Sequence, residues 1–301
     1  MPDRRLLLVH AHPDDESIGS GLAMARYVAE GAQVTLVTCT LGEEGEVLVP
    51  ELAHLAADRE DRLAEHRLGE LADAMAHLGV TDHRRLGGDF AYRDSGMIWD
   101  ENGNAAAADE IDPRAFWRAD LLEAANHLVA VIRELRPQVL VTYDEFGNYG
   151  HPDHIQAHRV AHYAASLAAA ESYRRDLGPA WDIAKIYWIA ESASRLREGA
   201  AMAAENGMDV PFDFDLDHLP PMFSEDEDLT TAISSTPEHV QAKLDAMRAH
   251  ATQITPDGQF FAMGMDLAAI TWGTEYYRLV KGRPGPRGES GFEEDLFAGL
   301  A

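Results

Sequence analysis

Two clusters of histidines and acidic residues each follow an apolar stretch of the chain. Residues 10–16 (HAHPDDE) come directly after the apolar residues 6–9, and residues 151–154 (HPDH) come after residues 139–142. In an open α/β sheet, ligands bind at the carboxyl ends of the strands. Zinc hydrolases commonly use three histidine or carboxylate ligands and leave a fourth position for water. The two clusters therefore predict one divalent-metal site shared by two strand ends.

The first cluster contains two adjacent carboxylates that can take different roles in hydrolysis, one as a metal ligand and one as a general base. Asp14 and Asp15 lie in a turn, where consecutive side chains point in different directions. One carboxylate can bind a metal, which lowers the pKa of its water towards ~7. The other can then accept the proton of that water as a general base. His12, Asp15 and one histidine of the second cluster complete a set of three ligands.

The second cluster contains more imidazoles than such a metal needs. His151 and His154 are three residues apart, so they share a face at the start of a helix. The histidine that does not bind metal is free to act as a general acid or to stabilise an oxyanion. Asp153 can hold an imidazole through a ring nitrogen, and Tyr149 can donate its phenol to an oxyanion.

A competing arrangement uses one helix only. His154, His158 and His162 are spaced by four residues and form a stripe on one helix face. The stripe has no glutamate in the His-Glu-x-x-His pattern of zinc proteases. We therefore expect His158 and His162 to be surface residues or to support the metal ligands indirectly.

Composition restricts the partners of the chain. Its 301 residues carry 52 acidic and 25 basic side chains, a net charge of -27. This charge repels phosphate backbones and anionic lipid, so we expect a small-molecule substrate and neither nucleic acid nor a membrane as partner. The single cysteine, Cys39, lies in an apolar stretch, and we expect it in the core of a cytoplasmic protein. We expect no signal peptide, because the apolar stretch near the first residue is short, and no transmembrane helix, because no apolar run is long enough to span a bilayer.

Predicted strands and helices alternate over the first two thirds of the chain. In order, we expect strand 6–9, helix 17–29, strand 33–39, helix 58–78, helix 113–135, strand 138–143, helix 152–170 and strand 183–189. This order predicts an α/β fold, a Rossmann-like and mostly parallel sheet with helices on both faces. We expect residues 1–190 to form the metal-hydrolase core. Residues 191–301 are a less regular C-terminal region that forms a lid or small lobe, with a loop at 209–228 and a helix at 237–251.

Several motifs resemble those of the LmbE-like (PIG-L) metal-dependent N-deacetylases. The resemblance spans nearly the whole chain and rests on residues 11–16 (AHPDDE), 151–154 (HPDH) and 250–253 (HATQ). Further segments are most similar to the mycothiol branch of that family, namely 38–46 (TCTLGEEGE), 93–97 (RDSGM) and 147–150 (GNYG). The resemblance implies a zinc-dependent deacetylase that hydrolyses the N-acetyl amide of N-acetylglucosaminyl-inositol in mycothiol biosynthesis.

The resemblance also assigns the metal site. Carried over residue by residue, the family's metal ligands fall on His12, Asp15 and His154, and its general base falls on Asp14. Two imidazoles and one carboxylate suit Zn²⁺ and also Fe²⁺.

Further roles follow from the same resemblance. It implies that His151 is a general acid or oxyanion stabiliser, with Asp153 as its partner and Tyr149 as a polarising phenol. His250 and Gln253 either approach the site from the C-terminal region or pack at a helix end. The family's substrate contacts fall on four positions, Arg67, Asp94, Glu46 and Met97.

Two other functions stay open on the sequence. A mycothiol S-conjugate amidase shares the metal motifs, although residues 93–97 favour the deacetylase. A non-catalytic sugar-binding relative is the remaining alternative. Residues 17–21 (SIGSG) depart from the mycothiol branch, so the contacts to the sugar beside the first motif can differ.

Overall fold

A mostly parallel β-sheet forms the centre of the computed structural model, which describes residues 3–100, 105–205, 215–258, 260–261 and 272–300. Its strands are β1 (Arg5–His10), β2 (Gln33–Thr38), β3 (Asp82–Arg85), β6 (Val139–Thr142), β7 (Lys185–Ser192), β8 (Phe223–Ser224), β9 (Thr231–Ser234) and β10 (Thr274–Lys281). They lie in the order β3-β2-β1-β6-β7-β10-β9, with β8 paired to β7. The pairs from β3 to β7 are parallel, whereas β10 is antiparallel to both β7 and β9.

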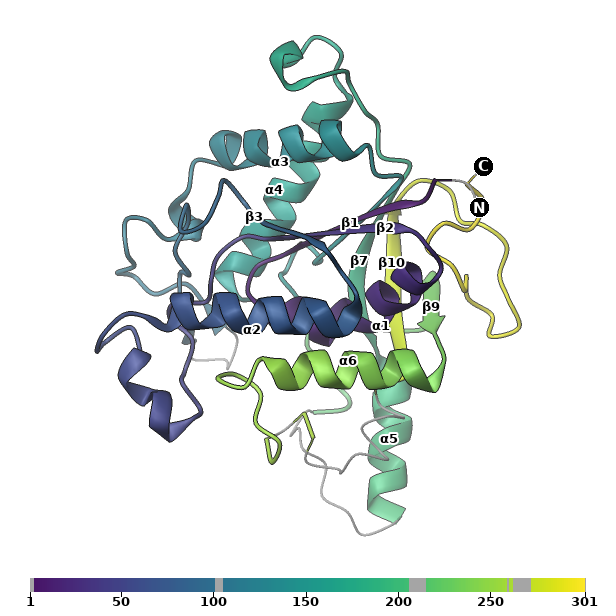
Figure 1. Ribbon diagram of the computed structural model, residues 1–301. Coiled ribbons are helices and arrows are strands. Elements are labelled where there is room, and N and C mark those ends of the chain that lie inside the picture. Colours follow the sequence, from purple (N-terminus) through teal and green to yellow (C-terminus); the bar gives the residue numbers. More distant parts are fainter. Residues whose placement is uncertain (1–2, 101–104, 206–214, 259, 262–271, 301) are drawn as a thin grey trace.

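Helices cover both faces of this sheet (Figure 1). One face carries α1 (Asp15–Ala29), α2 (Leu63–Leu78) and α6 (Pro237–Ala249), which pack against one another, and the other carries α3 (Leu121–Leu135) and α4 (Pro152–Ala169). The smaller elements are α5 (Ala193–Glu205), the 3-10 turns η1 (Pro50–Leu55), η2 (Phe116–Arg118) and η3 (Arg175–Leu177), and the strand pair β4 (Ile98–Trp99) and β5 (Ala105–Ala106). The predicted Rossmann-like α/β fold is confirmed. None of the helices in the described ranges is long and apolar enough to cross a membrane.

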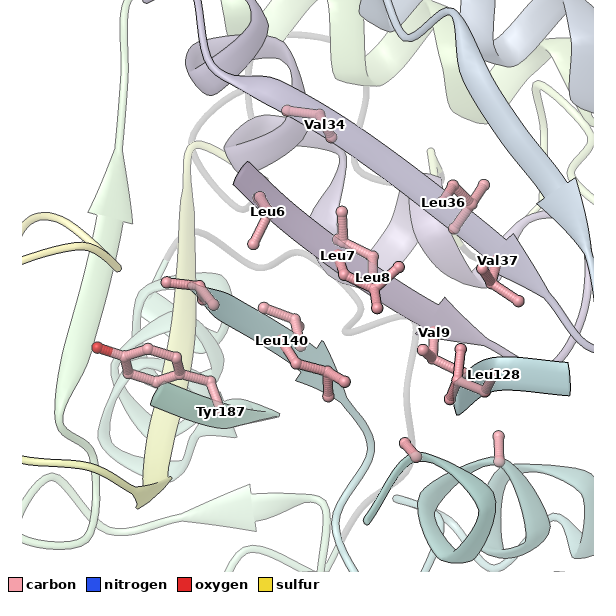
Figure 2. Close-up of a cluster of buried hydrophobic side chains, with 14 of the residues drawn as sticks. Leu6, Leu7, Leu8, Val9, Val34, Leu36, Val37, Leu128, Leu140 and Tyr187 are labelled. Carbon is pink, nitrogen blue, oxygen red and sulfur yellow. The ribbon is translucent and has the colours of Figure 1, made fainter. Parts of the chain in front are cut away.

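The central strand β1 is buried on both sides. The side chains of its apolar residues 6–9 are almost completely inaccessible to solvent, as the cover of helices on both faces requires. Figure 2 shows them beside Val34, Leu36 and Val37 of β2, Leu140 of β6 and Leu128 of α3. Cys39 is a free, buried thiol beside this core, as the sequence predicted.

The helix starts differ from the sequence prediction. The α3 helix begins at Leu121 rather than at 113, because Asp120 caps it and accepts a hydrogen bond from the backbone N–H of Glu123 at 2.8 Å. The α2 helix begins at Leu63 rather than at 58, since Asp61 has a left-handed backbone conformation with φ of 53°. The first helix starts two residues early, at Asp15.

The C-terminal region contributes both strands and a buried anchor. β9 and β10 extend the sheet beyond β7. Glu293, after β10, lies 3.1 Å from the ammonium group of Lys185 at the start of β7, and both side chains are buried. Thr231 also donates to Glu293, at 2.9 Å. The division at residue 190 into core and lid stays a prediction, and residues 209–214 of the predicted loop lie outside the described ranges.

Replacing Lys185 by methionine is expected to lower the free energy of unfolding by about 3–5 kcal/mol, because Glu293 would be left as an unpaired buried charge. Urea denaturation followed by circular dichroism measures the change. Lys281→Met is the matched control, because the ion pair of Lys281 with Asp182 lies at the surface, where a pair contributes only about 0–1 kcal/mol. An equal decrease in the free energy of unfolding of the two variants would contradict the expectation.

Candidate active site

The two clusters identified in the sequence leave neighbouring strands at the same edge of the sheet. β1 and β6 are parallel partners, with Leu8 opposite Val141. The chain continues from β1 into α1 and from β6 through a loop into α4. β2 lies on the other side of β1, so the strand order reverses between β1 and β6. In open α/β sheets ligands bind at the carboxyl ends of the strands beside such a reversal, and we call this place between β1 and β6 the crevice.

The three expected metal ligands meet in this crevice. One carboxylate oxygen of Asp15, Oδ2, lies 3.3 Å from Nδ1 of His12 and 3.3 Å from Nε2 of His154. The rings of His12 and His154 are 5.3 Å apart between centroids. Both imidazoles are buried. The structure thus brings together two imidazoles and one carboxylate from segments more than 130 residues apart in the sequence.

The residues present fit a divalent metal. Both ring nitrogens of His154 are buried and make no hydrogen bond among the described residues, although Nε2 has the 3.3 Å contact with Asp15. A buried imidazole with free nitrogens beside a carboxylate is suited to bind a cation. Ligand atoms of His12, His151 and His154 lie within 4.8 Å of one another, so the additional imidazole of His151 borders the same site as the expected ligands. On the far side of its ring, Nε2 of His12 lies 3.3 Å from Asp153, the kind of carboxylate contact that orients metal-binding histidines.

The charges in the crevice are strongly coupled. Burial opposes protonation of His12, but the carboxylates of Asp94, Asp15 and Asp153 outweigh burial and hold its pKa well above the usual value. Burial likewise opposes ionisation of Asp15, but His154 and His12 hold the pKa of Asp15 well below its usual value. The crevice therefore holds an ionised carboxylate that needs a neighbouring positive charge, which a bound metal would also provide.

Asp14 lies beside the ligands but has partners of its own. Its carboxylate accepts a hydrogen bond from Nη2 of Arg67 at 2.9 Å. Arg67 is buried and also donates to the backbone oxygens of Pro13 and Gly42. Gly42 is required at this contact, because a Cβ there would lie 1.8 Å from Nη1 of Arg67. Burial raises the pKa of Asp14 to about 6, against the opposing effect of Arg67, which is a suitable value for a general base.

His151 is held as a neutral imidazole. It is the N-cap of α4, and its Nδ1 accepts a hydrogen bond from the backbone N–H of Asp153 at 3.1 Å. The ring proton must then be on Nε2. Burial, together with His12 and His154, lowers the pKa of His151 to about 2. In this state His151 can donate a hydrogen bond from Nε2.

Asp153 has different partners from those expected. Its carboxylate accepts hydrogen bonds from the backbone N–H of Ser95, at 2.9 Å, and from the Ser95 hydroxyl, and it contacts His12. The sequence had suggested a contact between the Asp153 carboxylate and the His151 ring. The structure instead places this carboxylate on Ser95 and His12, and Asp153 contacts the His151 ring through its backbone N–H.

The remaining site residues lie at different depths. The ring of Tyr149 is 5.1 Å from that of His154, and burial raises the pKa of Tyr149, so its phenol stays protonated and can donate. Asp94 is buried, with Oδ1 3.4 Å from Nε2 of His12. Glu46 and Met97 are exposed.

Tyr143 was not singled out in the sequence analysis, yet it contacts two of the proposed ligands. Its hydroxyl donates to Oδ2 of Asp15 at 2.8 Å and accepts from the backbone N–H of Ala11 at 2.8 Å. Its ring stacks on His154 with 4.2 Å between centroids. Tyr143 is the first residue after β6, so its position at a strand end is the signal that could have identified it.

Tyr143→Phe is expected to weaken metal binding by about 10- to 100-fold, because Asp15 would lose the hydrogen bond that orients it. Competition with a chromophoric chelator measures the metal affinity. Tyr173→Phe, which removes a hydroxyl hydrogen bond to Asn126, is the control and should bind metal as the wild type does. An unchanged metal affinity of Tyr143→Phe would refute this role.

Comparison with known proteins decides the family. The sequence matches the family model of PIG-L, GlcNAc-PI de-N-acetylase, over residues 7–165. The chain belongs to the PIG-L family. The matched stretch contains both histidine clusters and hence all three expected metal ligands. The class predicted from the sequence, a hydrolase of the deacetylase type, is confirmed at the level of this family.

Similarity to curated PIG-L relatives extends over the whole chain. The chain is 66% identical over 300 residues to the 1D-myo-inositol 2-acetamido-2-deoxy-alpha-D-glucopyranoside deacetylase of Nocardioides sp. (strain ATCC BAA-499 / JS614), with 99% of each chain covered. It is 63% identical over 302 residues to the protein of the same name from Kribbella flavida, covering 100% of this chain and 99% of the relative.

Solved structures share the fold at much lower identity. An N,N'-diacetylchitobiose deacetylase from Pyrococcus horikoshii superimposes with a TM-score of 0.59 at 17% identity, covering 94% of this chain and 85% of that chain. The zinc inhibited form of teicoplanin deacetylase Orf2 gives a TM-score of 0.54 at 19% identity, covering 91% and 97%. These matches support the α/β architecture of the PIG-L family member described here.

Proposed function

We propose that the protein hydrolyses the N-acetyl amide of 1D-myo-inositol 2-acetamido-2-deoxy-alpha-D-glucopyranoside, as a step of mycothiol biosynthesis. The observation that carries the proposal is the full-length identity of 66% and 63% to curated deacetylases of that name. The convergence of His12, Asp15 and His154 in one crevice supports the same chemistry.

We assign the metal site to those three residues. Their donor set fits Zn²⁺, with Fe²⁺ as the alternative. A divalent metal held there would supply Lewis acidity to the amide carbonyl and to the attacking water. Tyr143 and Asp153 would orient the ligands, through Asp15 and His12 respectively.

The protein's own groups account for the proton transfers. Asp14 accepts a proton from the attacking water and, once protonated, returns it to the nitrogen of the leaving amine. The phenol of Tyr149 and Nε2–H of His151 donate hydrogen bonds to the oxyanion of the tetrahedral intermediate. The low pKa of His151 favours this role over that of a general acid, because the ring carries no extra proton to give.

Substrate recognition is assigned to residues around the crevice. Asp94 faces His12 from the loop after β3, and Glu46 and Met97 are exposed on nearby loops. Arg67 donates hydrogen bonds to Asp14 and to two backbone carbonyls, so we propose that it holds the base in position. A contact between Arg67 and the substrate is proposed from the family resemblance.

The test is release of a primary amine from the acetylated glucosaminyl-inositol by zinc-loaded protein, measured with an amine-reactive fluorophore. A chelated sample is the control, and free N-acetylglucosamine tests the need for inositol. Chelator-sensitive release is the expected result. If metal-loaded, folded protein instead cleaves only a mycothiol S-conjugate, it is the amidase, and absence of both reactions would indicate a binding protein.

A further inference from the structure

Asp14 has a backbone conformation that a non-glycine residue rarely adopts. Its φ is 122° and its ψ is -38°. Such strain persists only where surrounding contacts hold it, and it is concentrated at functional sites. Arg67 binds the Asp14 carboxylate, as described above, and the backbone oxygen of Asp14 accepts hydrogen bonds from the N–H groups of Ser17 and Ile18, both at 3.0 Å. A further contact holds the other side of its backbone. The backbone N–H of Asp14 donates to Oε2 of Glu16 at 2.9 Å.

Glu16 is itself held by a residue from the other end of the chain. Its Oε1 lies 2.8 Å from Nε2 of His250, and it also accepts a hydrogen bond from the Ser17 hydroxyl at 2.6 Å. Glu16 and His250 are completely buried. A buried carboxylate is costly unless it is paired and hydrogen-bonded, so Glu16 depends on His250 and Ser17 for its position.

His250 is well placed to provide a fixed partner. It is the C-cap of α6, which packs on α1 and α2. The residues that follow are hydrogen-bonded to α2 and its neighbours. Thr252 donates to Glu70 of α2 through its backbone N–H at 2.8 Å and through its hydroxyl at 2.7 Å. Gln253 donates to the backbone oxygen of Glu46 at 3.0 Å.

We infer that Glu16 and His250 are positioning residues, a buried pair that holds the backbone of Asp14 so that its carboxylate can act as the base. The inference rests on the function proposed above. It gives a role to the motif at 250–253, which metal binding and proton transfer leave unused. The chain of contacts runs from α6 through His250 and Glu16 to Asp14, and complete burial leaves neither positioning residue a surface that a substrate could contact.

A purely structural pair would affect stability but not the chemical step, and this difference defines the test. His250→Ala is compared with Lys185→Met, because each leaves one buried glutamate without its charged partner and Lys185 lies at the opposite end of its strand from the crevice. Both variants are assayed with zinc-loaded protein well below their melting temperatures. We expect His250→Ala to lower kcat at least tenfold, with KM and bound metal within twofold of the wild type, and Lys185→Met to keep kcat within twofold. Equal kcat values in the two variants would overturn the inference.

A second variant covers the case in which His250→Ala does not fold. The double substitution E16L/H250L removes both charges, so no unpaired charge stays buried. Its kcat should also fall at least tenfold, and a wild-type kcat would overturn the inference.

A crystal structure of the same double variant tests the inference without any substrate. The inference expects Asp14 to leave its φ near 122°, and retention of that conformation would overturn it. If the wild type itself releases no amine, the proposed function fails, and this structural result still decides the positioning role.

Discussion

Asp14→Asn is expected to lower kcat about 1000-fold while the protein keeps its bound metal. General bases contribute about 10²–10⁴-fold to enzymatic rates. Asparagine has nearly the same shape as aspartate but cannot accept the proton of the attacking water. The metal should stay, because the proposed ligands are His12, Asp15 and His154, whereas the Asp14 carboxylate pairs with Arg67. Steady-state amine release and metal analysis of the same preparation measure both quantities.

The pH profile of the wild type should report the same carboxyl group. Burial raises the pKa of Asp14 to about 6, although Arg67 opposes the shift. A base works only when deprotonated, so kcat/KM of the wild type should fall as the pH decreases through about 6. In Asp14→Asn this acid limb should be absent from the residual activity.

A second aspartate-to-asparagine substitution, away from the site, controls for effects of the substitution that do not come from losing the base. Asp73 is exposed on α2, and Asp73→Asn should have wild-type kcat and metal content. The assignment of the base is wrong if Asp14→Asn retains kcat within tenfold of the wild type. Loss of the metal together with activity in that variant would instead make Asp14 a ligand.

His154→Ala is expected to lose metal and activity together. Loss of a residue that merely orients a ligand weakens metal binding about 10- to 100-fold, and loss of one of three ligands should exceed that. We therefore expect no more turnover than in chelated wild-type protein. The effect should also appear in stability, because a metal at 100 times its Kd stabilises the folded protein by about 2.7 kcal/mol. Added Zn²⁺ should raise the Tm of the wild type and leave that of His154→Ala unchanged.

The comparison variant for this test lies on the same helix. The imidazole of His162 accepts a hydrogen bond from the Trp188 indole at 2.8 Å and points to β7 rather than into the crevice. His162→Ala should therefore bind metal like the wild type. Equal loss of metal in both variants would favour the helical stripe of histidines over the site shared by two strand ends.

Much of this site could be predicted because its chemistry is local in sequence. An apolar strand followed at once by imidazoles and carboxylates places these groups at the edge of a parallel sheet, whatever the detailed packing. His12, Asp15 and one histidine of the second cluster follow from that rule, and the family resemblance selects His154. In the structure each of the two imidazoles lies 3.3 Å from the Asp15 carboxylate. Tyr143 obeys the same rule and was missed because a tyrosine after a strand is not by itself a metal-site signal.

Contacts between distant segments could not be predicted in the same way. We expected the Asp153 carboxylate to bind the His151 ring. In the structure the His151 ring caps its own helix, and the Asp153 carboxylate contacts Ser95 and His12. Likewise, the pairing of His250 with Glu16 depends on how α6 packs against α1, and no periodicity in either helix specifies which buried groups face each other.

The sequence by itself determined the α/β alternation, the two strand ends that carry ligands, the buried core strand and the likeness to the PIG-L family. These are properties of short segments, where side-chain spacing and the polarity of neighbours decide the outcome. Only the tertiary structure decided which carboxylate meets which imidazole and what holds Asp14 in its strained conformation. The physical reason is that a buried charged group pairs with whichever group of opposite charge lies near it in the folded chain. Strand pairing and helix packing set the distances between such groups.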